Sequence, residues 1–206
     1  MAQTNEPSDH IEQLTTMAKA KGFLGREFLT WLWYVADTHK DRLKVEPLDP
    51  SSSEAKAFDV DLWVDDKMIL ESTAAMAHQS VMKGGDPSKS LEADVALKSG
   101  KTVRELKLGM NIKGVGEFTA VIGADDLNPR GLKLPAPDSV QQTSAEDETP
   151  LAMRLQHTEI FLAVLDGLFG QFLATRTDQK WEDGKGELAA IRTWIKGRQS
   201  RADTLH

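Results

Sequence analysis

The sequence predicts an α+β fold, in which a unit of antiparallel strands is flanked by helices on its N-terminal and C-terminal sides. Three observations lead to this prediction. Residues 58–134 contain stretches of alternating apolar and polar residues separated by short turns, which is typical of antiparallel strands. Residues 23–35 and 150–176 instead repeat apolar residues at spacings of three and four, which is typical of helices. The 206 residues are also enough to bury a sizeable core.

Composition divides the chain into four segments. They are N-terminal helices and a loop (1–57), a central α+β unit with antiparallel strands (58–134), an acidic linker (135–149) and a C-terminal helical segment (150–206). In the first segment, a short polar helix is expected from His10 to Lys21, with Asp9 as its N-cap. The prolines and serines of residues 45–57 predict a loop.

The helix expected from Phe23 to Val35 is apolar on nearly all sides. Its apolar residues are Leu24, Phe28, Leu29, Trp31, Leu32, Trp33 and Val35. A helix of this kind must be buried on more than one side. It is therefore either the central core helix or half of an oligomer interface, in which Phe28, Trp31 and Trp33 are the candidate interface residues.

The strands of the central unit are predicted in chain order from alternation and turn residues. Phe58 to Val64 is a half-buried strand, Asp65-Asp66 is a turn, and Lys67 to Thr73 returns as a second strand. A third strand covers Ala77 to Lys83, and a short helix capped by Ser88 or Ser90 runs through Ser99.

A second strand pair follows this helix. Thr102 to Ile112 alternates, with its inward face formed by Arg104, Leu106, Leu108, Met110 and Ile112. After a turn at Lys113 to Gly116, Glu117 to Ile122 is the partner strand, and Gly131 to Leu134 adds a short one. Beyond the linker, Thr149 and Pro150 open a long helix, and a last helix is expected from Glu182 to Arg198.

Composition also limits the class of protein. The formal net charge is −7, from 25 Lys and Arg against 32 Asp and Glu, which argues against a protein whose whole surface coats nucleic acid. The absence of cysteine excludes disulfides, cysteine nucleophiles and thiolate metal sites, and favours a reducing, cytoplasmic location. No apolar run near the ~20 residues of a membrane span is apparent, and residues 1–9 lack the features of a signal peptide.

The charge is unevenly distributed along the chain. Residues 81–133 carry nine basic and seven acidic side chains and are net positive. The candidate DNA-binding residues in this region are Lys83, Lys89, Lys98, Lys101, Arg104, Lys107 and Lys113. Clustered on one surface, they would contact phosphates without reading sequence.

Four aspartates offer a different chemistry. Asp59, Asp61, Asp65 and Asp66 could bind a divalent cation, because hard cations take carboxylate oxygens. The same residues also fit the solvated face of a hairpin, because they lack the glycine and distal glutamate of an EF-hand loop. No nucleophile, phosphate-loop or dinucleotide motif occurs. We therefore assign no catalytic residue, cofactor or metal ligand from the sequence.

Residues 90–108 combine a predicted short helix, the pattern Gly100-Lys101-x-Val103 and a strand of alternating apolar and polar residues. This stretch resembles the RdgC family of recombination-associated proteins. The likeness continues through Glu117 to Ile122, Asp125-Asp126 and Arg130 to Leu134, and Leu24 to Trp33 resembles divergent bacterial members. It is dense over residues 80–134.

The resemblance implies a cytoplasmic, nucleoid-associated protein that binds DNA with little sequence preference, forms homodimeric rings around duplex DNA and restrains RecA. By position it carries over to Lys98, Lys101, Arg104 and Lys107. The chain is shorter than the better-known members and lacks much of their N-terminal half, which leaves ring closure open.

Three hypotheses follow. The first is a DNA-binding, RdgC-like homo-oligomer whose phosphate groove is lined by the basic residues of 83–113, joined by the basic stretch Arg192 to Arg201. The second is a non-enzymatic adaptor that binds other proteins through exposed apolar helices. The third is a metal-dependent nuclease that uses the four aspartates.

Overall fold

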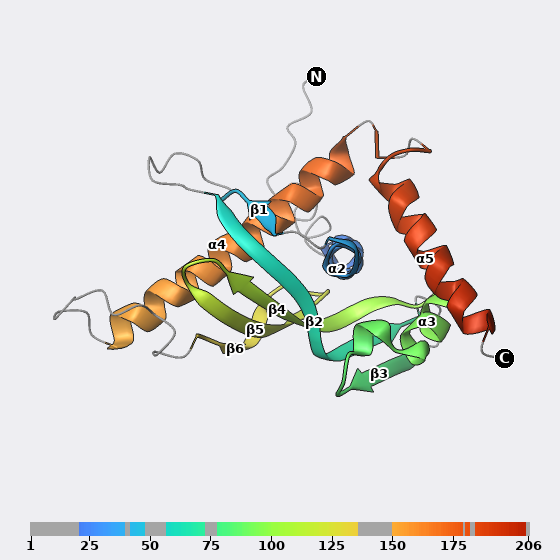
Figure 1. The fold of residues 1–206 in the computed structure, drawn as a ribbon, viewed down its shortest axis with the longest axis horizontal. Coiled ribbons are helices and arrows are strands. Elements are labelled where there is room, and N and C mark those ends of the chain that lie inside the picture. Colours follow the sequence, from blue (N-terminus) through green and yellow to red (C-terminus); the bar gives the residue numbers. More distant parts are fainter. Residues whose placement is uncertain are drawn as a thin grey trace, which may run out of the picture.

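The fold is shown in Figure 1 as a computed structural model, which describes residues 21–39, 42–47, 57–72, 78–135, 150–178, 180–181 and 184–204. In this part of the chain, a six-stranded antiparallel sheet and the helices around it confirm the predicted α+β class. The helices are α2 (Lys21–Thr38), α3 (Leu91–Lys98), α4 (Pro150–Thr177) and α5 (Glu187–Thr204), with a short 3₁₀ helix η1 (Pro87–Lys89). The strands are β1 (Leu43–Val45), β2 (Phe58–Glu71), β3 (Gln79–Lys83), β4 (Thr102–Ile112), β5 (Gly116–Gly123) and β6 (Pro129–Lys133).

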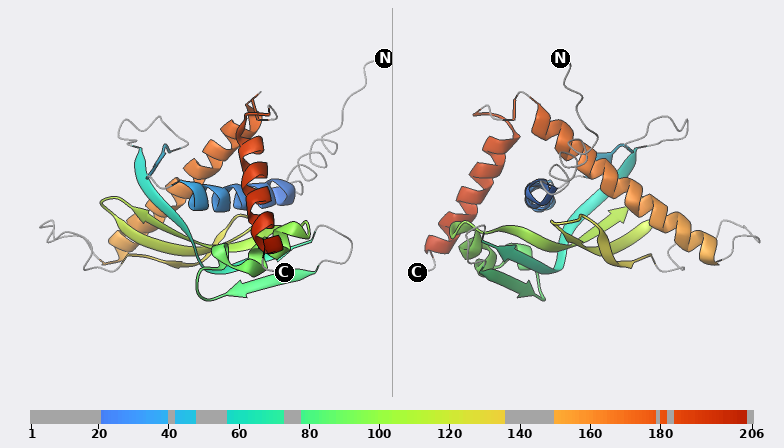
Figure 2. Two further views of the ribbon diagram at one scale, coloured as in Figure 1. Left: turned by 45° about the vertical axis from the view of Figure 1, so that its right-hand side comes forward. Right: turned by 180° about the vertical axis from the view of Figure 1, so that it is seen from behind.

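The strand order in the sheet is β1-β2-β4-β5-β6, and β3 pairs with the C-terminal part of β2. Figure 2 shows α2, α4 and α5 on one side of the sheet, while the other side carries no helix of the described residues. We call these the helix face and the open face. The division follows the alternation of side chains: Val64 of β2 pairs with Leu108 of β4, and both are buried on the helix face.

The apolar surface of α2 was expected to make it either the central core helix or half of an oligomer interface. The structure shows that it is the core helix. The side chains of Leu29, Leu32 and Trp33 are fully buried, and Phe28 and Trp31 are 1% and 6% exposed. These residues therefore face the core of their own chain. Phe28, Trp31 and Trp33 have little surface left for a second subunit, so the structure does not place them at an oligomer interface.

Helix α4 packs across the helix face and against α2. Phe161 lies 5.8 Å from Phe118 of β5, and Phe172 lies 5.5 Å from Phe28 of α2, between ring centroids. Within the described residues, Leu151–Thr177 is also long and apolar enough to cross a membrane by length and composition, although no apolar run of that length was expected from the sequence. One third (33%) of its most apolar window is buried in this fold, so its apolar residues are divided between core and surface.

The predicted turn at Asp65-Asp66 is wrong. Phe58 to Glu71 forms one bent strand, because both halves pair with β4: Val64 opposes Leu108 and Met68 opposes Leu106. The residues between Val64 and Met68 form a β-bulge, which bends the strand without ending it.

A second register shift in the same strand pair changes the place of Arg104. Ile69 pairs with Glu105, whereas Leu70 pairs with Val103, so Arg104 falls out of the alternation. Its side chain is 37% exposed, whereas those of Leu106, Leu108, Met110 and Ile112, with which it was predicted to share an inward face, are buried.

Other expectations agree with the structure more closely. Thr102–Ile112 has the predicted bounds, and Ser90 caps α3 by accepting a hydrogen bond from the amide of Ala93. Strand β1 lies at the edge of the region predicted as a loop, and α5 begins at Glu187 rather than Glu182. The expected helix from His10 to Lys21 lies almost wholly outside the described residues, as do the linker after 135 and the N-cap Thr149.

Candidate functional site

The basic residues predicted to bind DNA come from several elements. They are spread over β3, η1, α3, the start of β4, its middle and the turn that follows it. Lys83 and Lys98 are exposed, Lys89 pairs with Asp86 at 2.8 Å, and the Nζ of Lys101 donates to Ser80 Oγ at 2.7 Å. The set is therefore divided among separate elements and partners.

The two members within β4 are neutralised by carboxylates. The Nζ of Lys107 lies 2.8 Å from Asp65 and 2.9 Å from Asp66, and these hydrogen bonds raise the pKa of Lys107. The Arg104 guanidinium bonds to Glu71 at 2.8 Å and to Asp125 at 2.9 Å. A phosphate would have to compete with these carboxylates for each cation.

Each of the four aspartates proposed as cation ligands forms an ion pair with a basic side chain of the protein. Besides Asp65 and Asp66, Asp61 accepts from Arg42 at 2.9 Å, and Asp59 lies 3.8 Å from Lys113. Among the described residues, no group of three or more His, Asp or Glu side chains is placed to hold a metal ion. The open face is thus a mosaic of both charges, as the solvated-hairpin alternative implies.

A separate ionic network surrounds Glu71, which is 4% exposed. Gln79 donates to one carboxylate oxygen at 2.8 Å, while Arg104 and Arg26 donate to the other. The hydrogen bonds from Gln79, Arg104 and Arg26 lower the pKa of Glu71 from 4.5 to about 2. The network joins α2 to the ends of β2, β3 and β4.

This network predicts a pH dependence of stability. Because the folded pKa of Glu71 is depressed, its ionised form favours the native state fully above pH 4.5, and that contribution is lost as the pH falls toward 2. Urea unfolding across this window should show that Glu71→Gln loses less stability on acidification than the wild type does. The exposed Glu117→Gln is the matched control and should follow the wild-type curve. Parallel curves for Glu71→Gln and the wild type would contradict the assignment.

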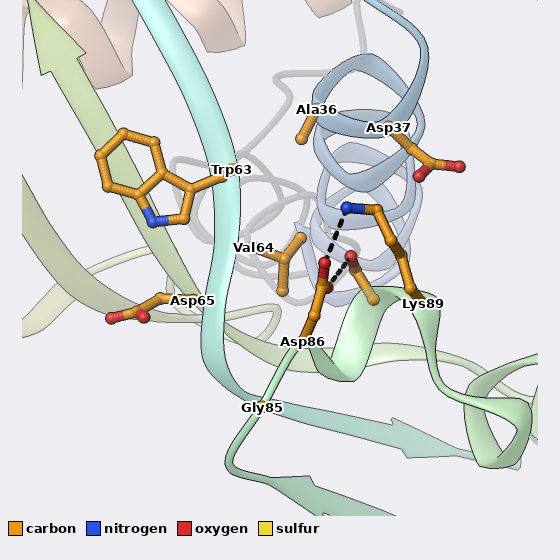
Figure 3. A pocket seen from close by; sticks show the side chains of 9 residues that line it. Ala36, Asp37, Trp63, Val64, Asp65, Gly85, Asp86 and Lys89 are labelled. Atoms are coloured by element: carbon orange, nitrogen blue, oxygen red, sulfur yellow. Dashed lines mark hydrogen bonds and ion pairs between the residues drawn. The ribbon is translucent and has the colours of Figure 1, made fainter.

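A polar pocket of about 300 Å³ lies between the C-terminal end of α2, the bend of β2 and the loop before η1 (Figure 3). Figure 3 shows Trp63 and Asp65 on the opposite side of β2 from Asp37 and Lys89. Lys89 is paired with Asp86, and Asp37 accepts hydrogen bonds from Trp194 and Arg198. The charged groups of this pocket therefore have partners within the chain.

A second cavity, of about 330 Å³, lies where α2, the end of α4 and α5 meet the start of β4. Its lining combines cationic and aromatic side chains. The lining residues are Arg26, Glu27, Thr30, Trp31, Thr102, Arg176, Trp181, Leu188, Ile191 and Arg192. We call this space the arginine cavity.

The three arginines of the cavity come from three helices and differ in their partners. Arg26 donates to Thr102 Oγ1 at 3.2 Å and to Glu71, outside the lining. Arg176 pairs with Glu27 at 2.9 Å. Arg192 is exposed and forms no hydrogen bond or ion pair with any residue that the structure describes. Among the described residues, two carboxylates therefore pair with three guanidinium groups, and Arg192 is the one left without a carboxylate.

Two tryptophans provide the apolar part of the same cavity. The Arg176 guanidinium carbon lies 5.4 Å from the ring centroid of Trp181, in cation–π geometry. Trp31 and Trp181 are each 6% exposed, and the indole N–H of Trp31 is buried without a hydrogen-bond partner among the described residues. The cavity can therefore receive a ligand that combines a flat apolar part with an anionic group.

Arg192 lies in the basic stretch that the sequence shows, whereas Arg26 and Arg176 carry no sequence signal. These two residues are 150 positions apart in the chain, and no local pattern connects either of them to α5. Only the packing of α2 and α4 on the sheet brings them together. No protein-family model, no curated protein and no solved structure matches the chain.

Proposed function

We propose that this protein binds single-stranded DNA and that the arginine cavity receives a nucleotide of the strand. The observation that carries the proposal is the meeting of three arginines and two tryptophans at one cavity, where Arg192 is exposed and pairs with none of the described residues. Arginine presents a planar set of donors that matches phosphate. Aromatic side chains next to basic ones suit the bases of single strands.

The size of the cavity favours a single strand over a duplex. A space of about 330 Å³ accommodates a group of nucleotide size, but not a stacked base pair with its neighbours. A base can enter such a space only when it is not held in a duplex stack. The resemblance of residues 80–134 to the RdgC family is a separate reason, from the sequence, to expect a DNA partner.

The open face is the weaker candidate for the same ligand. Lys107 contacts two carboxylates there, so a phosphate would bring its own charge close to those acids. Arg192 has no such competitor among the described residues. An anion at the arginine cavity therefore gains a charge-assisted hydrogen bond without breaking an existing pair.

The test is a fluorescence-anisotropy titration of labelled oligothymidylate with two charge-reversal variants. Arg192→Glu and Lys83→Glu change the net charge equally, and both positions are exposed and lack partners among the described residues. Arg192→Glu should weaken binding by about tenfold or more, the value of a lost charged hydrogen bond. It should also reduce the slope of log affinity against log salt by about 0.7. Lys83→Glu should bind like the wild type.

Two results would contradict the proposal. One is an absence of binding at low salt. The other is an equal loss of affinity in Arg192→Glu and Lys83→Glu, which would indicate a diffuse electrostatic attraction rather than a site. A duplex of the same length serves as the ligand control and should bind less tightly than the single strand.

A further inference from the structure

We propose that the N-terminal half of α4 is a self-association surface, along which two copies of the chain pack with their α4 helices parallel. This inference goes beyond DNA binding and rests on a different part of the molecule. Leu151, Leu155 and Leu162 are 67%, 57% and 39% exposed, and they are the largest group of exposed leucines among the described residues. We call them the leucine stripe.

The spacing of the leucine stripe is that of a coiled-coil seam. Counting in sevens with Leu155 and Leu162 at position a places Leu151 and Thr158 at position d. These four residues lie on one face of the helix, beside the buried face that Phe161 turns toward the sheet. The hydroxyl of Thr158 already donates to the carbonyl oxygen of Arg154 at 2.8 Å, so its methyl group can enter an apolar contact.

The charges that flank the leucine stripe identify a second copy as the occupant. In this register Arg154 stands at position g and Glu159 at position e, five residues later. In a parallel pair of helices, a residue at g faces the residue at e that is five positions further along the other helix. Arg154 of each copy would thus face Glu159 of the other, twice, by symmetry.

Both of these charged residues are available for such a contact. The side chains of Arg154 and Glu159 are exposed, and neither forms an ion pair with the residues that the structure describes. In an antiparallel pair, symmetry would bring like flanks together, so Arg154 would face Arg154 and Glu159 would face Glu159. The charge pattern therefore selects the parallel arrangement.

A charge-swap series tests the pairing, read by light scattering and sedimentation of the 22.7 kDa chain across a wide concentration range. The wild type should form a dimer. Arg154→Glu and Glu159→Arg should each weaken dimerisation by about tenfold, because each turns two attractive contacts into repulsive ones. The double variant Arg154→Glu/Glu159→Arg should restore the wild-type affinity. All three change only exposed side chains, so unchanged circular dichroism and melting temperature verify the fold.

Because the chain contains no cysteine, orientation can be tested with one introduced thiol. Leu151→Cys should form a disulfide-linked dimer on mild oxidation, since identical d positions meet in a parallel pair. The exposed Lys83→Cys is the matched control and should remain monomeric on a non-reducing gel. A monomeric wild type, dimerisation unaffected by Arg154→Glu, or binding of the stripe to phosphatidylcholine vesicles in place of a second chain would each overturn the proposal.

Discussion

Replacing Arg198 with alanine is expected to lower the free energy of unfolding by about 3–5 kcal/mol, the cost of breaking a buried ion pair. Arg198 is 2% exposed and joins three helices. Its Nε atom lies 2.8 Å from Asp94 of α3, and its Nη1 atom lies 2.8 Å from Asp37 of α2. Without the guanidinium, the nearly buried carboxylate of Asp94 would lose this partner.

Aromatic packing adds to the same effect. The guanidinium carbon of Arg198 lies 4.7 Å from the ring centroid of Trp33 and 5.2 Å from that of Trp194. The side chain also donates to the carbonyl oxygen of Ser88. Arg198 therefore attaches α5 to α2 and α3, so its removal should loosen the wall of the arginine cavity that α5 provides.

The measurement is urea unfolding followed by tryptophan fluorescence. Arg192→Ala is the control on the same helix and should change stability by less than about 0.5 kcal/mol, as exposed positions usually do. In a double-mutant cycle, Asp94→Ala with Arg198→Ala should cost less than the two single changes added together. A cost for Arg198→Ala as small as that for Arg192→Ala would show that α5 does not pack in this way.

Two glycine-to-alanine substitutions in helices should have opposite effects. A Cβ atom at Gly25 of α2 would overlap the carbonyl oxygen of Ala124, which follows β5. Because the obstacle is backbone, Gly25→Ala should destabilise the protein by about 1–3 kcal/mol or more. A Cβ atom at Gly197 of α5 would meet nothing within 4 Å. Gly197→Ala should therefore stabilise the protein by about 0.5–1 kcal/mol through helix propensity alone.

The shift in the urea midpoint of each variant checks this pair. Equal and stabilising shifts for both substitutions would mean that α2 does not rest against the turn after β5. That outcome would also remove the support for the position of Arg26, one residue further along α2, in the wall of the arginine cavity.

The local parts of the fold could be predicted because they depend on short-range patterns. The alternation from Thr102 to Ile112 and the Ser90 cap of α3 are examples. The predicted turn at Asp65-Asp66 failed for a non-local reason. Two adjacent aspartates usually favour a turn, but here both flanking stretches pair with one long strand, and a bulge absorbs the extra residues.

The candidate site depended even more on long-range packing. The sequence showed that Lys107 and Arg104 are basic, but their carboxylate partners are set by the register of β2 against β4 and by the turn after β5. Conversely, Arg26 and Arg176 carry no local signal, and their meeting with Arg192 follows from how α2, α4 and α5 cover the sheet. The spacing of apolar residues located α2 in the sequence. Only the burial of those residues in the folded chain showed that α2 is a core helix rather than part of an oligomer interface.

The indole N–H signals of the five tryptophans can distinguish DNA binding at the arginine cavity, as proposed, from binding on the open face. Trp31 and Trp181 line the cavity, whereas Trp63 lies on the open face over Gly109, the residue opposite it in β4. In a ¹⁵N-resolved titration with oligothymidylate, we expect the Trp31 and Trp181 signals to shift while that of Trp63 stays in place. A shift of Trp63 with unchanged Trp31 and Trp181 would contradict the proposal and place the DNA beside Lys107 instead.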